Sequence, residues 1–393
     1  MRAVHFSIGL SLLSATMAPA QQAPCGGDFS AFVGQLAQDG VARGHDPATI
    51  QRFLSDVRQD PAVLQRDRGQ GIFQTPFIEF SRKLISQDRL DRGRRLAQQY
   101  DGVFSQIERN YGIARGVLLA FWAFETDFGA FQGDFNTLNA LVTLAHDCRR
   151  PEIFRPQIFA ALELYEQGAF DPATTTGAWA GEIGQVQMLP RDILENGVDG
   201  DGDGQVRLKA SAPDALMSGA KMLAGLGWRH GEPWLEEVEL PEGMDWGLSG
   251  LETTRTVAEW ERLGVRARDG ALDDGRLEAS ILLPQGKGGP SFIAYPNFRV
   301  YFEWNQSFTY VMTAAYFATR LEGAPVYEAG TPAPGLSGEQ MQALQRALQA
   351  RGYDVGEIDG ILGAGTRAAV RDMQSRLGLA ADGWPTQELL NRL

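Results

Sequence analysis

One carboxylate ends the most apolar stretch of the sequence, which reads Val-Leu-Leu-Ala-Phe-Trp-Ala-Phe-Glu-Thr-Asp-Phe-Gly over residues 117–129. Eight apolar residues precede Glu125, and Gly129 follows four positions later. The run is too short to span a membrane and has no polar face, so we expect a buried helix closed by the glycine. Desolvation at such a helix end raises the pKa of a carboxyl group, which suits a general acid near neutral pH. A glutamate that only caps the helix is the structural alternative.

A second segment rich in polar and small residues, 177–190, contains three glycines and the closely spaced glutamines Gln185 and Gln187. Glycine lets the backbone come close to a ligand, so the amide groups of this segment are candidates for ligand binding. Glutamines that only stabilise a turn are the alternative.

The sequence Asp-Gly-Asp-Gly-Asp-Gly-Gln-Val, residues 199–206, matches the first eight positions of an EF-hand calcium loop. The match ends at position twelve, where Ala210 replaces the usual glutamate. The alternative is an Asp/Gly turn without a metal. The candidate ligands for a structural Ca²⁺ are Asp199, Asp201, Asp203, Gln205 (through its backbone carbonyl) and Asp214.

Composition and chain ends limit the class of protein. The 393 residues are 44% hydrophobic, and the net charge of −13 argues against nucleic acid and anionic membrane surfaces as main partners. Residues 1–20 predict an export signal, with Arg2 before an apolar stretch and small residues before Gln21. Since no later segment reaches the roughly 20 apolar residues of a membrane span, we expect an exported, soluble protein that is not an integral membrane protein.

Two cysteines, Cys25 and Cys148, are present. In an oxidising compartment they predict one disulfide, with two free buried thiols as the alternative. Because residues 22–24 match a lipid-attachment box poorly, we do not expect a lipid anchor on Cys25.

The elements that position these residues are mainly helical, with a smaller β region, so the fold class is mainly α (α+β). A basic cluster at Arg89, Arg92, Arg94 and Arg95 is interpreted as a solvated helix face. The pattern predicts helices within 28–116, 138–145, 158–165 and 308–321, a small sheet within 231–300, a Pro/Gly linker at 328–336 and a three-helix module at 337–393.

Over residues 28–325, a series of motifs resembles those of the B-type lytic murein transglycosylases and follows the same order along the chain. They are Phe-Glu-Thr-Asp-Phe-Gly at 124–129, Trp-Ala-Gly-Glu-Ile-Gly-Gln-Val-Gln at 179–187, the Asp-Gly loop, Leu-Gly-Trp at 226–228, Gly-Pro-Ser-Phe-Ile-Ala-Tyr-Pro-Asn-Phe at 289–298 and Trp-Asn-Gln-Ser-Phe-Thr-Tyr at 304–310. Residues 337–393 resemble the three-helix peptidoglycan-binding domain of cell-wall enzymes.

The resemblance implies a signal peptide (1–20), a lysozyme-like catalytic domain (21–327), the linker and a C-terminal peptidoglycan-binding domain. It implies a periplasmic enzyme that cleaves the MurNAc–GlcNAc bond of peptidoglycan glycan strands without water, with no cofactor for the chemistry, and that works with cell-wall synthesis or division complexes. Glu125 matches the catalytic acid/base. Residues expected to contact substrate are Gln187, Asn305, Tyr310, Trp304 and Trp179. Trp228 and Phe292 are further candidates for sugar contacts, with core packing as the alternative.

Three departures from the family pattern affect the expected subsites. Ala178 stands where serine is common, Trp304 replaces tyrosine, and Met188-Leu189 replaces Phe-Met. They leave the acid in place and change the groups expected to bind the sugar and its N-acetyl substituent.

A single acid is sufficient for substrate-assisted cleavage, in which the 2-acetamido group stabilises the developing oxocarbenium ion. A hydrolytic muramidase that uses Asp127 as its second carboxylate is one alternative. A non-catalytic cell-wall-binding scaffold protein is the other.

Overall fold

The computed structural model describes residues 25–69 and 75–393; the expected export signal lies outside the described residues. Helix α7 (Arg115–Thr126) lies at the centre of the largest hydrophobic core. Nine of its twelve residues are buried, because apolar side chains occupy every face of the helix. The elements that pack in this core include α4 (Phe77–Leu84), α5 (Gln87–Gln99), α6 (Asp101–Tyr111), α11 (Ala212–Gly225), α13 (Pro296–Trp304) and α14 (Phe308–Leu321).

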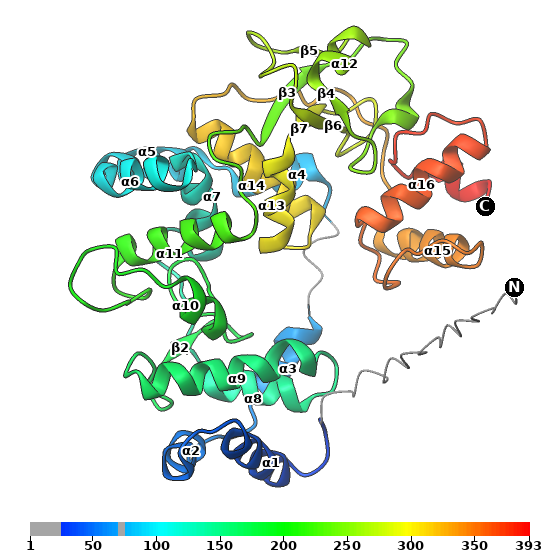
Figure 1. Cartoon of the computed structure of the whole chain (residues 1–393). Helices are drawn as coiled ribbons and strands as arrows, with labels where there is room; N and C mark the ends of the chain where they lie inside the picture. The colour runs from blue at the N-terminus through cyan, green and yellow to red at the C-terminus, as the bar shows by residue number, and fades with distance from the viewer. Residues whose placement is uncertain (1–24, 70–74) are drawn as a thin grey trace, which may run out of the picture.

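A second helical layer has its own core, below the first in Figure 1. Helices α8 and α9 pack side by side in this layer, and a two-stranded antiparallel ladder connects it to the turn that begins at residue 177. The elements are α1 (Phe29–Ala42), α2 (Pro47–Leu54), α3 (Pro61–Arg68), β1 (Phe135–Asn136), α8 (Thr137–His146), α9 (Pro151–Glu166), β2 (Thr176–Gly177) and α10 (Pro190–Asn196).

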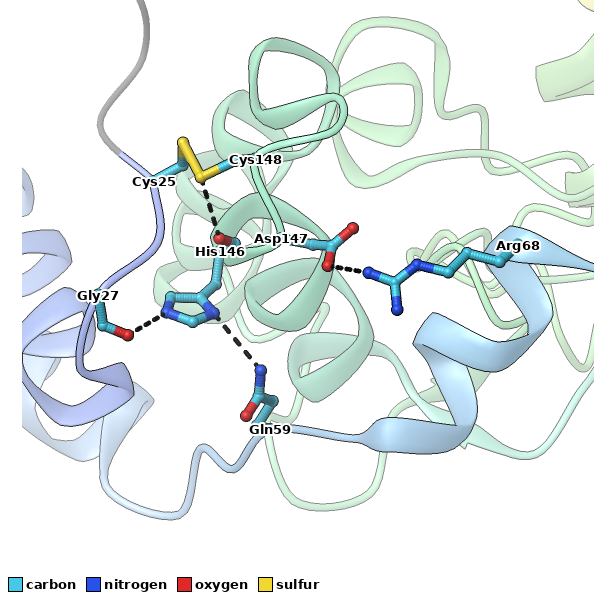
Figure 2. Close-up of a disulfide and its surroundings, with 7 residues drawn as sticks. All are labelled: Cys25, Gly27, Gln59, Arg68, His146, Asp147 and Cys148. Carbon is cyan, nitrogen blue, oxygen red and sulfur yellow. Dashed lines mark hydrogen bonds and ion pairs between the residues drawn. A yellow bond between two sulfur atoms is a disulfide. The ribbon is translucent and has the colours of Figure 1, made fainter.

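The disulfide that the sequence predicts is present in the second layer. Cys25 and Cys148 are bonded across 123 residues of sequence. Figure 2 shows the adjoining His146, whose ring contacts the carbonyl of Gly27 and the amide of Gln59. The bond therefore joins the start of the described chain to the segment just after α8.

Five short strands form one antiparallel sheet in the order β4-β6-β7-β3-β5. Ile281 of β6 pairs with Ile293 of β7, and both side chains are fully buried in one hydrophobic cluster with Trp260 of the adjoining helix α12. The elements are β3 (Leu235–Glu239), the short 3₁₀ helix η2 (Trp246–Leu248), β4 (Arg255–Thr256), α12 (Val257–Arg262), β5 (Arg266–Ala267), β6 (Glu278–Leu282) and β7 (Phe292–Ala294). The expected mainly helical fold with a small sheet is confirmed.

The C-terminal module consists of α15 (Gly338–Gln349), α16 (Ala364–Arg376) and α17 (Gln387–Asn391) around a separate small core. Two buried glutamines organise its Asp-Gly turns in the same way. The side-chain Oε1 of Gln345 accepts from the Gly360 N–H at 2.9 Å, and the side-chain Oε1 of Gln374 accepts from the Gly383 N–H at 2.9 Å. Each glutamine thus links its helix to a tight turn through a buried side-chain hydrogen bond.

The module packs directly against the sheet domain. The guanidinium of Arg367 donates to the carbonyl of Pro284 at 2.8 Å and lies over the ring of Phe308. Its burial, reinforced by the neighbouring charge of Arg371, lowers the pKa of Arg367 to about 9. Arg371 forms an ion pair with Glu252 of the sheet domain. A buried cation on backbone carbonyls gives the two parts a specific contact in addition to the linker.

Candidate active site

Glu125 lies in the last turn of α7, where the helix ends at Thr126. The sequence predicted that Gly129 closes the helix, but the left-handed turn begins earlier: Asp127 (φ 50°) and Phe128 (φ 60°) adopt it as well as Gly129 (φ 85°). The Asp127 N–H donates to the carbonyl of Ala123, so the chain reverses immediately after the acid. Two non-glycine residues held in this conformation indicate a backbone that its surroundings constrain, which is a common feature of functional sites.

A cleft with a volume of about 490 Å³ opens at Glu125, between the two helical layers. Its wall combines one side of α11, the start of α10, the end of α13 and the segment that follows β2. The lining residues are Glu125, Ala178, Trp179, Glu182, Gln187, Leu189, Asp192, Met222, Leu226, Glu303, Trp304 and Asn305.

Two aromatic side chains donate hydrogen bonds to the Oε1 atom of Glu125. The Tyr310 hydroxyl is at 2.5 Å and Trp304 Nε1 is at 3.0 Å. Trp304 is held in this position by stacking on Phe121, with ring centroids 4.4 Å apart. Burial and the neighbouring Glu125 raise the pKa of Tyr310 well above its usual value, so the phenol stays protonated and donates.

The pKa of Glu125 is raised, because desolvation by its apolar surroundings outweighs the opposing hydrogen bonds from Tyr310 and Trp304. Both of these bonds reach Oε1, and no salt bridge to Glu125 occurs among the described residues. The carboxyl is therefore suited to carry a proton on Oε2 and to release it to a group in the cleft. A carboxyl that exchanges a proton near neutral pH is the chemical requirement for general acid/base catalysis.

Asp127 does not take part in the cleft that the described residues form. Its carboxylate accepts from Arg92 at 2.7 Å and from Arg89 at 3.0 Å. Burial alone would raise the pKa of Asp127, but the two guanidinium groups outweigh it and lower the pKa. The interpretation of these two arginines as a solvated face was wrong: they hold the turn that follows Glu125. Of the other two, Arg94 pairs with Asp91 at the surface, and Arg95 is exposed.

The segment after β2 places Gln187 in the cleft wall and Gln185 in the core. Gln187 has a left-handed backbone (φ 54°), and its side-chain amide donates to the carbonyl of Gly184 at 2.7 Å. Gln185 is buried and accepts from Trp122 Nε1 at 3.0 Å, so it supports α7 from behind. Gln187 therefore lies where a ligand in the cleft could contact it, which stays a prediction, whereas Gln185 does not line the cleft.

The structure brings the remaining expected contact residues together. Trp179, Trp304 and Asn305 line the cleft. Tyr310 is not among the lining residues, but its hydroxyl donates a hydrogen bond to Glu125, which is. Trp228 and Phe292 are instead buried in the main core, where Trp228 Nε1 donates to a backbone carbonyl and Phe292 packs against Phe77. Core packing was the stated alternative for these two rings, and the structure supports it.

Sequence reasoning missed three acidic residues of the cleft: Glu182, Asp192 and Glu303. Glu182 stands inside the glycine-rich segment already singled out, so its place between two glycines was an available signal. Burial, with smaller effects that include the charge of Glu125, raises the pKa of Glu182 to about 7. The cleft thus contains a second carboxyl with an unusual pKa, and that carboxyl is not Asp127.

The Asp-Gly loop brings three carboxylates together. Asp199, Asp201 and Asp203 each offer an oxygen within 4.8 Å of the others. Asp214 is fully buried behind the loop, and its carboxylate accepts from the backbone N–H groups of Gly200, Asp201 and Arg207. Asp214 therefore stabilises the loop through its backbone.

The described helices include none with the length and apolar character needed to cross a lipid bilayer. The sulfur of Cys25 is bonded to Cys148 and cannot carry a thioether-linked lipid in this state.

A partly buried carboxyl at the end of an apolar helix, aromatic donors that hold it and a cleft lined by both polar and aromatic side chains are typical of a glycan-cleaving site. The chain matches the transglycosylase SLT domain family over residues 28–319 and a peptidoglycan binding domain family over residues 337–393. The chain belongs to the transglycosylase SLT family.

Individual relatives support this assignment. A crystal structure of SltB3 from Pseudomonas aeruginosa, in complex with NAG-anhNAM-pentapeptide, is 35% identical; the match covers 93% of this chain and 99% of that chain, with a TM-score of 0.85. Membrane-bound lytic murein transglycosylase B of Escherichia coli is 24% identical over 73% of this chain and 82% of its own length. The E. coli lytic transglycosylase Slt35, in complex with calcium, shares the fold at 24% identity and a TM-score of 0.65, over 77% of this chain and 97% of that chain. The lysozyme-like fold class expected from the sequence is confirmed.

Proposed function

We propose that the protein is a peptidoglycan lytic transglycosylase that cleaves the β-1,4 bond between MurNAc and GlcNAc and leaves 1,6-anhydroMurNAc ends. The observation that carries the proposal is the state of Glu125: a desolvated carboxyl, held by two donors on one oxygen, that lines a cleft of about 490 Å³. A relative named membrane-bound lytic murein transglycosylase B and a relative solved in complex with NAG-anhNAM-pentapeptide support the same reaction.

The reaction requires one proton to move twice. Protonated Glu125 gives its proton to the glycosidic oxygen as the bond to C1 breaks, and the 2-acetamido carbonyl oxygen stabilises the positive charge at C1. The Glu125 carboxylate then accepts the proton of the C6 hydroxyl, and O6 bonds to C1. Atoms and charges balance without water. Tyr310 and Trp304 stabilise the carboxylate between the two steps and keep its orientation.

Product analysis in water labelled with heavy oxygen tests this reaction against the hydrolytic alternative. Purified sacculi digested by the protein should give muropeptides that end in anhydro sugars and contain no label. A muramidase would give reducing ends that contain the label. Unlabelled anhydro ends support the proposal, and labelled reducing ends as the main product refute it. A scaffold protein without catalytic activity would release neither.

We infer that the C-terminal module binds peptidoglycan and that the protein acts as an exported, periplasmic enzyme without a lipid anchor. The match of residues 337–393 to a peptidoglycan binding family supports the first statement. The predicted signal at 1–20 and the disulfide support the second. Association with cell-wall synthesis or division complexes remains part of this proposal, and affinity isolation of the exported protein tests it.

We propose that the Asp-Gly loop binds a structural Ca²⁺. The clustered oxygens of Asp199, Asp201 and Asp203, with the backbone carbonyl of Gln205, fit the oxygen ligands that calcium prefers. The charge of Arg207, which pairs with Asp203 here, would have to move away from the ion. The ion would restrain the loop, and the chemistry at Glu125 requires no step through it. Asp214 would act behind the site unless its carboxylate exchanges its backbone partners for the ion.

A further inference from the structure

Glu182 occupies a rigid turn at the cleft. The Ala178 N–H donates to the carbonyl of Glu182 at 2.9 Å, which closes the turn. A Cβ atom at Gly177 would meet that same carbonyl oxygen at 1.9 Å, so only glycine fits there. Gly181 (φ 92°) lies so close to the second helical layer that a Cβ would meet Leu141 at 2.4 Å. The position of Glu182 is therefore imposed by the backbone on both sides.

One oxygen of the Glu182 carboxyl lacks a hydrogen-bond partner among the described residues, whereas backbone N–H groups of Glu182 and Ala180 act on the carboxyl and lower its pKa slightly against the larger effect of burial. That oxygen, Oε2, is shielded from solvent, so a substrate donor reaches it only after the side chain rotates into the cleft, which Glu182 lines together with Glu125. The cation whose charge acts on Glu182 is Arg150, and the guanidinium of Arg150 is bonded to Asp67. A buried acceptor without a donor is costly to the folded protein, so a function is expected to maintain it.

The other acidic residues of the cleft have different surroundings. Asp192 accepts from the backbone N–H of Leu189 at the start of α10, which is a helix-capping role. Glu303 is exposed near the end of α13. Among the described lining residues, Glu182 is thus the carboxyl whose pKa the charge of Glu125 helps to raise and whose Oε2 atom is buried without a hydrogen-bond partner.

The substrate supplies an N–H donor next to the reacting atom. The 2-acetamido group is attached to the carbon adjacent to C1, where Glu125 promotes bond breakage. A carboxylate that accepts the acetamido N–H increases the negative charge on its carbonyl oxygen and restrains its rotation. Both effects favour attack of that oxygen on C1, because the interaction strengthens as positive charge develops in the group.

We propose that Glu182 accepts the N–H of the substrate's 2-acetamido group and directs its carbonyl oxygen toward C1. The assignment rests on the proposed transglycosylase reaction and adds a second carboxyl to it. Ala178, next to it in the turn, offers no polar side chain for this purpose, so Glu182 is the acidic group that the turn provides. Glu125 remains the residue that transfers the proton.

Two variants separate this role from a structural one. Glu182→Met keeps the length of the side chain and removes the acceptor, whereas Glu182→Gln keeps an acceptor oxygen without charge. Glu163→Gln, on the exposed face of α9, is the control. The probes are purified sacculi and a GlcNAc-thiazoline, whose fused ring imitates the acetamido group bonded to C1.

We expect Glu182→Met to lower kcat roughly 100-fold with little change in KM, and to weaken thiazoline inhibition by a similar factor. Glu182→Gln should recover part of both losses, and retention on sacculi should stay unchanged in each variant. A Glu182→Met protein with wild-type kcat, or with wild-type thiazoline inhibition, overturns the assignment. If neither variant folds, Glu182→Asp is used, whose shorter side chain draws the carboxylate back from the cleft. This variant must lower kcat and thiazoline affinity together, and unchanged values overturn the assignment of Glu182.

Failure of the reaction itself gives a different result. If wild-type protein releases no anhydro ends from sacculi, the proposed function fails. If wild-type protein releases them and Glu182→Met does so at the same rate, only the assignment of Glu182 fails.

Discussion

Replacing Glu182 by glutamine should stabilise the protein at neutral and alkaline pH. Burial holds the pKa of Glu182 at about 7 in the folded protein, against an ordinary value of 4.5. Between these two values the unfolded chain releases the proton more readily than the folded chain does. Glu182 therefore does not lower the free energy of unfolding below pH 4.5, and it lowers that free energy increasingly as the pH rises to 7. Because one pKa unit corresponds to about 1.4 kcal/mol, the full cost is about 3 kcal/mol above pH 7.

The glutamine side chain has a similar shape and does not ionise. We expect the free energy of unfolding of Glu182→Gln to equal that of the wild type at pH 4 and to exceed it by up to about 3 kcal/mol at pH 8. Relaxation of the buried site and water entry would lower this figure, so the direction and the pH dependence are the decisive results.

Urea unfolding of the full-length mature protein at several pH values between 4 and 8 measures the difference. Glu163→Gln provides the matched control, since this exposed glutamate should show no such pH-dependent gain. A Glu182→Gln protein that is less stable than the wild type at pH 8, or equally stabilised at pH 4 and pH 8, would refute the reasoning. The first result would mean that hydrogen bonds to the Glu182 carboxylate outweigh its desolvation.

Three further predictions concern the acid, the metal loop and the docked module. Tyr310→Phe removes a donor that lowers the pKa of Glu125, so that pKa should rise and the alkaline fall in kcat/KM should move to higher pH; a pH–rate profile with an unmoved alkaline side would contradict this. Calcium should raise the Tm of the wild type and leave that of Asp199→Asn unchanged; a wild type without any calcium-dependent rise in thermal denaturation would remove the metal site. Arg367→Ala should detach the C-terminal module, which small-angle scattering would detect as a larger radius of gyration, while cleavage of soluble glycan stays at the wild-type rate; an unchanged radius would show that other contacts hold the module.

Much of the site was predictable because it is local in sequence. The apolar run before Glu125 determines both the burial of α7 and the raised pKa of its last carboxyl. The helix at 308–321 and the sheet within 231–300 follow from periodicity and turn residues in the same way. For the part of the site that is distant in sequence, the family resemblance indicated Trp304 and Tyr310, which lie 179 and 185 residues from Glu125.

The parts that were not predictable depend on contacts distant in sequence. Arg89 and Arg92 looked like a surface cluster because nothing in their own helix shows that Asp127 turns toward them. The positive φ of Gln187 separates it from Gln185, yet both glutamines stand in the same glycine-rich segment. Glu182 was overlooked because its unusual pKa results from burial in a tertiary cleft, which a short motif does not reveal.

The most direct test of the central claim compares the Glu125→Gln variant with wild-type protein on purified sacculi, with released muropeptides analysed by mass spectrometry. Glutamine preserves the shape of the side chain but can neither donate the proton nor accept it back. We predict wild-type retention on sacculi and a loss of anhydro products by at least about 1000-fold. Anhydro products released by Glu125→Gln at a rate near that of the wild type would contradict the account.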